Sequence, residues 1–335
     1  MAKFELSLDS LKLHTKDLSG VSVLITGGAG FIGSHLATYL VKNGAKKVVV
    51  LDDLSTGFEK NIEPLRSSIN FSFIKGNITD QETCMKASKG IDVVLHHAAL
   101  GSVPRSIENP IRTNEVNVSG FVNMLFAAKE CGVKKFVYAS SSSVYGDDET
   151  FPKIESKTGN LLSPYAVSKY TNEKYAGVFS SLYNLQTVGF RYFNVFGERQ
   201  NPEGAYAAVI PKFISSLLHN KQAGIYGTGN NTRDFTYVAN VVKANLLCIE
   251  NGDLPIKSVM NIACGGTISV NEIYKSIAEQ LGKTEVKPVY LPERPGEIKN
   301  SYANISLATQ ALGYKPVVTT QDGIIQTVKW FKERI

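Results

Sequence analysis

A glycine-rich turn between an apolar stretch and an amphipathic stretch constrains the fold of this chain most strongly. The sequence VLITGGAGFIGSHLATYL, residues 23–40, places Gly27, Gly30 and Gly33 in a GxxGxxG spacing. The early glycines allow a sharp turn and bring backbone N–H groups close to a phosphate, and the third allows close packing of a helix on a strand. The spacing therefore predicts a strand, a tight turn and a helix whose N-terminus faces an anion.

Short apolar runs alternate with longer helical patterns from Val21 onward. Parallel strands buried on both faces have this apolar character, and we expect them at residues 21–26, 47–51, 71–75, 92–97, 135–140 and 187–193. Helical patterns lie between them at about 32–43, 114–130 and 165–182. This alternation predicts the α/β class, with a Rossmann-type, doubly wound parallel sheet.

The character of the chain changes after about residue 194, where turn-rich stretches separate helical segments near 206–219, 237–250 and 270–281. Open α/β sheets bind ligands at their carboxyl edge, where a second region can pack. We expect three parts, with some later segments returning to the sheet: an N-terminal extension (1–20), a Rossmann domain (21–193) and a smaller, mainly substrate-binding region (194–335).

Composition excludes several classes of function. The 36 Lys and Arg residues exceed the 30 Asp and Glu residues only slightly and are scattered, so we expect no nucleic-acid partner. The four cysteines show no CxxC spacing, which favours reduced thiols in a cytoplasmic protein over disulfides or a metal site. No long apolar run appears at the N-terminus, so we expect neither a signal peptide nor a membrane partner.

An acidic residue ends the second predicted strand. Asp52 closes the run VVVLD and lies about twenty residues beyond the glycine turn, where a carboxylate can accept hydrogen bonds from an adenosine ribose. The next residue is Asp53 rather than an arginine, so a 2′-phosphate would be repelled. NAD is therefore favoured over NADP.

Two Tyr–Lys pairs occur in SPYAVSKYTNEK, residues 163–174. Tyr165 precedes Lys169 by four residues and Tyr170 precedes Lys174 by four, so each pair shares a helix face. The pairs point about 140° apart around the helix, so only one can face the ligand edge. The Ser-Pro before Tyr165 is typical of a helix start, which places Tyr165 in the first turn beside the loops.

Acid–base chemistry follows from that placement. A free tyrosine has a pKa near 10. A lysine ammonium and a cationic nicotinamide would favour the phenolate and lower this pKa, so we interpret Tyr165 as the base and Lys169 as its electrostatic partner. The strand before them ends in four serines, Ser140 to Ser143, whose hydroxyls can bond a substrate oxygen.

These features in this order resemble the extended short-chain dehydrogenase/reductase family from Val21 onward. Within it the chain is most similar to the UDP-hexose 4-epimerases, and more narrowly to the bacterial UDP-N-acetylglucosamine 4-epimerase branch. The narrower resemblance rests on HHAALGSVPRSIENP (96–110), ASSSSVYGD (139–147), SPYAVSKY (163–170), RYFNVFGERQNPEGAYAAVIPKF (191–213) and GTGNNTRDF (227–235).

The resemblance implies an NAD enzyme and a set of site residues. The catalytic hydroxyl is Ser141, with Ser142 and Ser143 lining the sugar pocket beside Tyr165 and Lys169. NAD would contact Gly27, Gly30, Phe31, Ile32, Gly33, Asp52, Asn77, Ile78, Ala98, Tyr165, Lys169 and Tyr192. The UDP-sugar would contact Ser102, Asn194, the 207–213 segment including Ala208 and Val209, Tyr226 beside the uracil, Arg233 and Arg294 on the diphosphate, and Ser301.

Two positions depart from the family pattern. Where the family often has Gly-Asp-Ile, this chain has Asn77, whose side-chain oxygen could still accept a bond from adenine. The sequence ALGSVPRS, residues 99–106, replaces the lysine-containing loop of the simple UDP-galactose epimerases. That replacement favours the acetamido-sugar branch.

The implied reaction inverts C4 of the sugar through a 4-keto intermediate without net redox. In the resembled enzymes a tyrosine near the end of the chain excludes N-acetyl groups, and alignment of RPGEIKNSYANIS (294–306) places Ser301 there. We therefore expect interconversion of UDP-GlcNAc and UDP-GalNAc, with weaker action on UDP-Glc and UDP-Gal.

Other readings stay open. A UDP-glucuronate or UDP-N-acetylhexosaminuronate 4-epimerase is the main alternative, and a non-catalytic NAD-sensing regulator is a distant one. A 4,6-dehydratase usually needs Asp-Glu where this chain has Ser142 and Ser143.

His96 and His97 suggest no metal site, because no other ligand lies nearby in sequence. Wide apolar arcs on the helices at 114–130 and 165–182 are consistent with the family's homodimer.

Overall fold

A seven-stranded parallel sheet forms the centre of the molecule, with strand order β11-β6-β5-β4-β1-β2-β3. The computed structural model describes residues 10–203, 207–252, 254, 257–293 and 300–334. Its strands are β1 (Ser22–Thr26), β2 (Lys47–Asp52), β3 (Phe71–Lys75), β4 (Val93–His96), β5 (Lys135–Ser141), β6 (Gln186–Tyr192) and β11 (Lys257–Ile262). The predicted α/β Rossmann-type sheet is confirmed, and its last strand comes from the C-terminal half of the chain.

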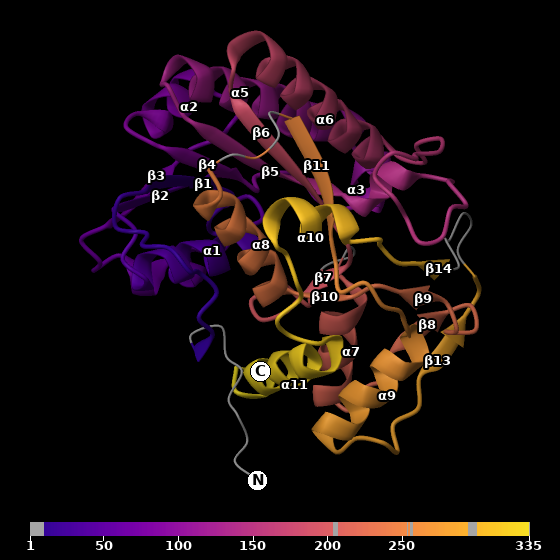
Figure 1. The fold of residues 1–335 in the computed structure, drawn as a ribbon. Coiled ribbons are helices and arrows are strands. Elements are labelled where there is room, and N and C mark those ends of the chain that lie inside the picture. Colours follow the sequence, from indigo (N-terminus) through magenta and orange to yellow (C-terminus); the bar gives the residue numbers. More distant parts are fainter. Residues whose placement is uncertain (1–9, 204–206, 253, 255–256, 294–299, 335) are drawn as a thin grey trace.

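Successive side chains of the central strands alternate between two buried cores. In β1, Val23 and Ile25 enter one core, whereas Leu24 enters the other. Helices α1 (Phe31–Lys42) and α8 (Val238–Glu250) cover the first face, as Figure 1 shows below the sheet. Helices α2 (Gln81–Ser88), α5 (Gly120–Glu130) and α6 (Pro164–Tyr183) cover the second face, at the top of Figure 1. Because both faces are covered, the strands need no polar side, as their apolar sequences predicted.

A smaller region packs at the carboxyl edge of the sheet, in the lower right of Figure 1. Its helices α7 (Val209–Leu218), α9 (Val270–Leu281) and α11 (Thr320–Lys332) contact one another. Its short strands form three small sheets: β7 (Val195–Phe196) with β10 (Thr236–Tyr237), β8 (Gly224–Tyr226) with β13 (Val289–Leu291), and β9 (Thr232–Arg233) between β12 (Ile268–Ser269) and β14 (Asn300–Ser301). Helix α10 (Ser306–Leu312) lies between this region and the sheet.

The remaining elements are short. Helices α3 (Val103–Glu108) and α4 (Pro110–Asn114) precede a π-helical segment, Glu115–Ser119, that leads into α5. The 3₁₀ turns η2 (Glu59–Asn61) and η3 (Glu63–Leu65) lie between β2 and β3, and the 3₁₀ turn η5 (Ser142–Tyr145) directly follows β5. The described part of the N-terminal extension packs on α1, because Leu13 and Leu18 are buried and the Leu13 N–H donates to the Tyr39 hydroxyl at 2.7 Å.

Two expectations from composition can be compared with the structure. All four cysteines carry free thiols, and those of Cys84 and Cys248 are buried. Among the residues that the structure describes, no helix combines the length and the apolar character needed to cross a bilayer.

Candidate functional site

The glycine turn lies between β1 and α1, and two of its positions leave no room for a side chain. Gly27 has a φ of +68°, and a Cβ atom there would stand 2.7 Å from the backbone nitrogen of Ala98. A Cβ atom on Gly33 would stand 2.2 Å from the carbonyl oxygen of Gly27. Gly30 caps α1 without a side-chain hydrogen bond, so no side chain blocks the N-terminus of the helix. The turn can therefore bring backbone donors against an anion.

Asp52 ends β2 next to this turn and is held rigidly. Its carboxylate accepts from the backbone N–H of Ala29 at 2.9 Å and from that of Leu54 at 2.8 Å. Burial raises the pKa of Asp52, and the two backbone bonds oppose that rise. A carboxylate has about four acceptor positions, and the Gly30 backbone also interacts with Asp52, so the group keeps capacity for a ribose hydroxyl.

The Asn77 side chain differs from the expectation. Its oxygen, which we expected to be available to adenine, accepts from both the N–H and the hydroxyl of Thr79 at 2.9 Å. Its amide nitrogen donates to the Asp53 carboxylate, also at 2.9 Å. An amide oxygen has two lone pairs, so this one is fully used. The group beside Asn77 that can still accept a hydrogen bond from adenine is therefore the Asp53 carboxylate, which also lines the cleft.

One cleft of about 470 Å³ unites the residues expected at the coenzyme. Its walls include all twelve: Gly27, Gly30, Phe31, Ile32, Gly33, Asp52, Asn77, Ile78, Ala98, Tyr165, Lys169 and Tyr192. Asp53, His97, Ser140, Ser141 and Gln200 also line it. The cleft runs from the strand ends of β1 and β2 to the first turn of α6, which is the edge where open α/β sheets bind ligands.

Tyr165 and Lys169 enter this cleft from the start of α6. Ser163 caps the helix by accepting from the Ala166 N–H at 3.1 Å, and Pro164 occupies the first helical position, as predicted. Lys169 is 3% exposed, and its ammonium donates to the carbonyl of Ala139 at 2.8 Å. The ammonium nitrogen lies 6.0 Å from the centroid of the Tyr165 ring.

Burial dominates the titration of both groups. It lowers the pKa of Lys169 from 10.5 to about 8. Burial raises the pKa of Tyr165, and a hydrogen bond with the Ser141 side chain lowers it in part. We expected a net lowering of the Tyr165 pKa, but in the protein without coenzyme the pKa is raised. The partner that opposes the rise is Ser141 rather than Lys169.

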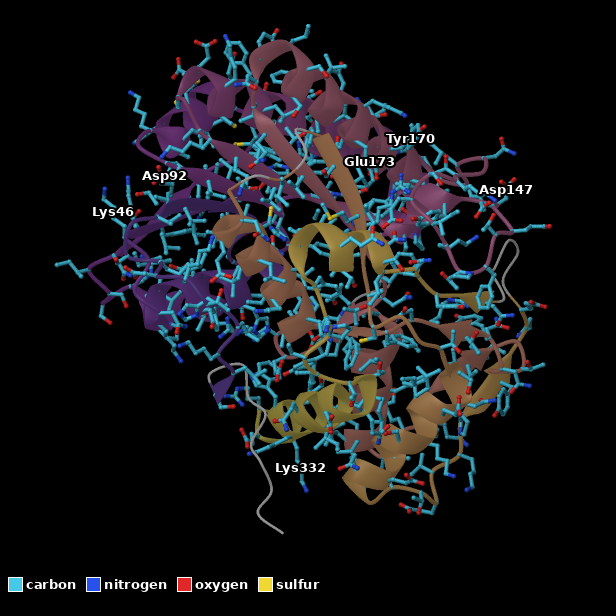
Figure 2. The ribbon with its side chains drawn as sticks, viewed as in Figure 1. Lys46, Asp92, Asp147, Tyr170, Glu173 and Lys332 are labelled. Carbon is cyan, nitrogen blue, oxygen red and sulfur yellow. The ribbon has the colours of Figure 1, made fainter. Side chains whose placement is uncertain are left out.

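The second Tyr–Lys pair lies elsewhere on α6. Lys174 is exposed, and its ammonium stands 4.4 Å from the centroid of the Tyr170 ring. Tyr170, labelled in Figure 2, packs against the cluster that contains Val144 and Phe193. Neither residue of this pair lines the cleft, so the structure separates the two pairs as the helix geometry predicted.

The serines at the end of β5 have different roles in the structure. Ser141 lines the cleft and accepts from the N–H of Ser143 at 3.1 Å and from its hydroxyl at 3.0 Å. With its lone pairs used in this way, the Ser141 hydroxyl can donate its proton toward Tyr165. Ser142 and Ser143 open the η5 turn and do not line the coenzyme cleft. Ser140 is buried and donates to Glu173.

The backbone of Tyr165 is fixed by two further serines that the sequence did not single out. The Tyr165 N–H donates to the hydroxyl of buried Ser106 at 3.0 Å, and the Ser168 hydroxyl donates to the Tyr165 carbonyl at 2.8 Å. Ser168 in turn accepts from Asn117 in the π-helical segment at 3.1 Å. Asn117 also holds both backbone groups of Leu100, so it joins the cleft wall to α6. Irregular helix turns of this kind are frequent at functional sites.

Ser102 stands at the start of α3 in an unusual conformation. Its φ is +127°, a region that residues other than glycine rarely adopt. Its hydroxyl accepts from the Arg105 N–H at 3.3 Å, and Ser106 follows four residues later. The loop that carries Ser102 is therefore tied through Ser106 to the first turn of α6.

His96 and His97 have structural partners rather than metal partners. The Nδ1 atom of His96 lies 2.9 Å from the Thr26 hydroxyl, and the Nε2 atom of His97 lies 3.1 Å from the Tyr192 hydroxyl. Burial lowers the pKa of His97 to about 4, so the ring is neutral. Across the described ranges, no group of three or more His, Cys, Asp and Glu side chains could hold a metal ion.

A second hollow of about 310 Å³ begins next to the coenzyme cleft, because Val195 lines the first and Asn194 the second. Four expected substrate residues line it: Asn194, Val209, Tyr226 and Arg233. Ser301 pairs with Arg233 in the register of β14 and β9, so it lies at the edge of this hollow. Ala208 caps α7 and is exposed, and Arg294 lies outside the described residues.

Comparison with known proteins relates this geometry to a family. A model of the NAD dependent epimerase/dehydratase family matches residues 23–263. A putative UDP-glucose 4-epimerase from Methanocaldococcus jannaschii is 39% identical over 312 residues, which cover 92% of this chain and 98% of that protein. A dTDP-D-glucose 4,6-dehydratase from Mus musculus is 36% identical over 321 residues, covering 93% of this chain and 88% of its own.

The fold also matches solved structures. The structure of UDP-N-acetylglucosamine 4-epimerase from Methanobrevibacter ruminantium M1, in complex with UDP-N-acetylmuramic acid, superposes with a TM-score of 0.89. Its sequence is 38% identical, and the match covers 95% of this chain and all of that chain. UDP-glucuronate 4-epimerases are among the relatives too, so similarity by itself leaves the sugar undetermined.

Proposed function

The chain belongs to the NAD-dependent epimerase/dehydratase family, and from that premise we propose that it interconverts UDP-N-acetylglucosamine and UDP-N-acetylgalactosamine by inverting C4 of the sugar. Weaker action on UDP-glucose and UDP-galactose is part of the proposal. The observation that carries it is the meeting of the Tyr165 phenol and the Ser141 hydroxyl in the cleft, beside a hollow edged by Arg233 and Ser301.

The coenzyme of this family is NAD, and the cleft fits it. The glycine cradle leaves no room for a Cβ atom at Gly27 or Gly33, and Asp52 offers the ribose a fixed acceptor. Asp53 places a second carboxylate beside Asp52, which disfavours a 2′-phosphate. When bound, NAD supplies the acceptor for a hydride from C4 of the sugar and returns that hydride to the opposite face.

Proton transfer falls to the residues of the chain. In the proposed reaction Tyr165 takes the proton of the 4-hydroxyl, and the same phenol later returns it. The Ser141 hydroxyl can donate a hydrogen bond to the Tyr165 oxygen, which favours the phenolate. Lys169 holds a positive charge near the Tyr165 ring below a pH of about 8, and a cationic ring of bound coenzyme would add to it.

Inversion requires the nucleotide to be held while the sugar turns. In the proposal Tyr226 packs beside the uracil, and Asn194, Ala208 and Val209 surround the nucleotide. Arg233 and Arg294 bind the diphosphate, where guanidinium groups suit two charged phosphates. A sugar bound as firmly as the nucleotide could not present both faces, so the sugar pocket must bind loosely.

Selectivity for an acetamido sugar follows from volume. Ser301 is half-buried beside Arg233, and a serine leaves space there for a 2-acetamido group. Ser102 is proposed to face the same sugar from the loop before α3. Ser142 and Ser143 complete the serine-lined side, where a 4,6-dehydratase usually carries an acidic pair, so we do not favour dehydration.

A second candidate is a 4-epimerase of UDP-glucuronate or of a UDP-N-acetylhexosaminuronate. The presence of UDP-glucuronate 4-epimerases among the relatives supports testing it. A non-catalytic NAD-sensing regulator is disfavoured, because Tyr165, Lys169 and Ser141 come together in one cleft.

We also propose that the chain divides into its two main regions at residue 194.

A homodimer is a further part of the proposal. Apolar side chains project from the outer surface of α6 and α5: Val167, Tyr175, Val178, Leu182 and Phe126 are between 37% and 68% exposed. A surface of this kind on two neighbouring helices suits a second copy of the same surface in a four-helix interface.

The proposed function is tested by incubating the purified protein with UDP-GlcNAc without added NAD. Proton NMR then reports the configuration at C4 of the sugar. Formation of UDP-GalNAc supports both the substrate and a retained coenzyme. Conversion of UDP-glucuronate but not of UDP-GlcNAc would replace the proposal with the second candidate.

A further inference from the structure

A buried polar network lies directly behind the catalytic residues and has no part in the proton transfer described above. It is centred on Glu173 in α6 and Arg191 in β6, whose side chains are 6% and 4% exposed. The Arg191 Nη2 and Nε atoms donate to the two Glu173 oxygens at 2.8 and 2.9 Å. The same carboxylate accepts from the Ser140 hydroxyl at 2.6 Å.

Glu173 shares the helix face of the catalytic pair. It follows Lys169 by one helical turn and Tyr165 by two, because residues four apart lie above one another. The side chain reaches from α6 toward the β6–β11 part of the sheet (Figure 2). Ser140 directly precedes Ser141 in β5, so Glu173 connects the face that carries Tyr165 to the strand end that carries Ser141.

The network occupies one row of the sheet. Ser140, Arg191 and Asn261 are register partners on the adjacent strands β5, β6 and β11. Asn261 accepts from the Tyr145 hydroxyl at 2.6 Å, and the Arg191 guanidinium lies 4.8 Å from the centroid of that tyrosine ring. The row that includes Ser140 is therefore braced on three strands immediately behind the row of Ser141 and Tyr192.

A second arm of the network reaches the C-terminal region. The Arg191 Nη1 atom donates to the Glu155 carbonyl at 3.1 Å, and the Glu155 carboxylate accepts from the Asn261 N–H at 2.8 Å. The Asn261 amide donates to the carbonyls of Lys153 and Asn304, both at 3.1 Å. Asn304 lies three residues after Ser301, so the network also anchors the segment proposed to wall the sugar pocket.

Stability alone does not account for a buried ion pair. The cost of removing both charges from water is close to what their attraction returns, and apolar pairs of similar volume are often as stable. The directional bonds of Glu173 do something that apolar side chains cannot, because they fix α6 and β5 in one register. We propose that Glu173, Arg191 and Ser140 are positioning residues that hold the Tyr165 phenol against Ser141 and the sugar-pocket wall. This inference rests on the proposed role of Tyr165.

The proposal is tested first with the double variant Glu173→Leu/Arg191→Met, which replaces the ion pair with apolar side chains. A second variant, Ser140→Ala, removes the Ser140–Glu173 hydrogen bond and keeps the ion pair. We expect the double variant to unfold at a denaturant concentration close to that of the wild type and to keep its bound NAD. Its kcat should fall by about 100-fold, the scale expected for a misplacement of about 1 Å, with a KM change below about threefold. Ser140→Ala should lose about tenfold in kcat.

The ion pair between Lys134 and Asp92 serves as a control. It lies at the opposite end of the same sheet, where the Lys134 Nζ atom stands 3.0 Å from the Asp92 Oδ1 atom. Figure 2 labels Asp92. The double variant Asp92→Leu/Lys134→Met should keep kcat within about twofold. A purely structural role predicts instead that the variants at Glu173 and Arg191 lose stability and coenzyme together. Retention of full kcat by the double variant would overturn the proposal.

A second readout is independent of the sugar reaction. Because the Ser141 hydroxyl lowers the pKa of Tyr165, moving the two apart should raise that pKa. Difference absorbance of tyrosinate, measured for each variant against the same protein with Tyr165→Phe, reports it directly. We expect the midpoint of the Tyr165 titration to lie at a higher pH in the Ser140 and Glu173 variants than in the wild type. If the wild type epimerises no UDP-sugar, the proposed function fails, while this titration still decides the positioning role.

Discussion

Lys169→Met should stabilise the coenzyme-free protein at neutral pH while abolishing its proposed activity. The ammonium is buried, and burial lowers its pKa from 10.5 to about 8. That difference corresponds to about 3 kcal/mol of destabilisation of the charged form in the folded state. Methionine has a similar length and no charge, so it removes this cost. It also removes the 2.8 Å bond to the Ala139 carbonyl, which is worth about 1 kcal/mol. The net expected gain is about 2 kcal/mol.

The sign of the pH dependence follows from linkage. Between a pH of about 8 and about 10.4, the unfolded lysine still binds a proton that the folded lysine has lost, so wild-type stability should rise with pH. The cost of Lys169 is therefore complete below about pH 8 and disappears above about pH 10.4. Near pH 9.5 the advantage of Lys169→Met should have shrunk by about 2 kcal/mol, to approximately zero.

Equilibrium unfolding in guanidinium chloride near pH 7 and near pH 9.5 measures both quantities. The control is Lys174→Met on the same helix, where the lysine is exposed over Tyr170 and the change should stay within about 0.5 kcal/mol at both pH values. A Lys169→Met protein that is no more stable than the wild type near pH 7 would refute the argument. An advantage that does not change with pH would refute it equally, because the gain would then come from packing.

Three further predictions concern the sugar pocket, the backbone of Tyr165 and the dimer. Ser301→Tyr should reduce kcat/KM for UDP-GlcNAc by at least about tenfold while sparing UDP-glucose, and undiminished turnover of the acetylated sugar would contradict the volume argument. Ser106→Ala leaves the part-buried N–H of Tyr165 without its acceptor, so the free energy of unfolding should fall by about 1–3 kcal/mol in denaturant titrations. Leu182→Asp places a charge on the exposed apolar surface of α6 and should convert the proposed dimer to monomer in sedimentation; a monomeric wild type would remove the dimer proposal.

The sequence was most informative where a residue has one physical purpose. Buried runs such as the one before Gly27 predicted the first six strands, and helix spacing separated Tyr165 from Tyr170. Strand β11 was not predicted in position, because KSVMNI contains a polar Asn261 that looks unsuited to a central sheet. In the structure Asn261 is fully buried, and its amide is satisfied by the Arg191 network. Hydrogen-bond partners that are distant in sequence cannot be recognised from the local apolar pattern of a strand.

Residues that act through a second residue were missed for a related reason. Ser106 is one serine among many, and only the fold brings its hydroxyl to the Tyr165 N–H. Glu173 carried a readable signal, since it continues the spacing of Tyr165 and Lys169, but a glutamate on a helix normally faces water. Asn77 could be placed in the cleft from sequence, yet the use of its oxygen by Thr79 depends on rotamers that sequence does not give.

The two halves of the proposed site differ in a way that suits inversion at C4. Around Tyr165 the partners are buried and directional: Lys169 and Glu173 are no more than 9% exposed, and Ser106 is fully buried. Around the second hollow Asn194, Ala208 and Tyr226, which are proposed to contact the nucleotide, are exposed. A rigidly held acid–base group can meet the 4-oxygen at the same point before and after the sugar turns, as the proposed inversion requires. The free energy spent on burying polar groups behind α6 is therefore consistent with a reaction in which the substrate moves and the phenol does not.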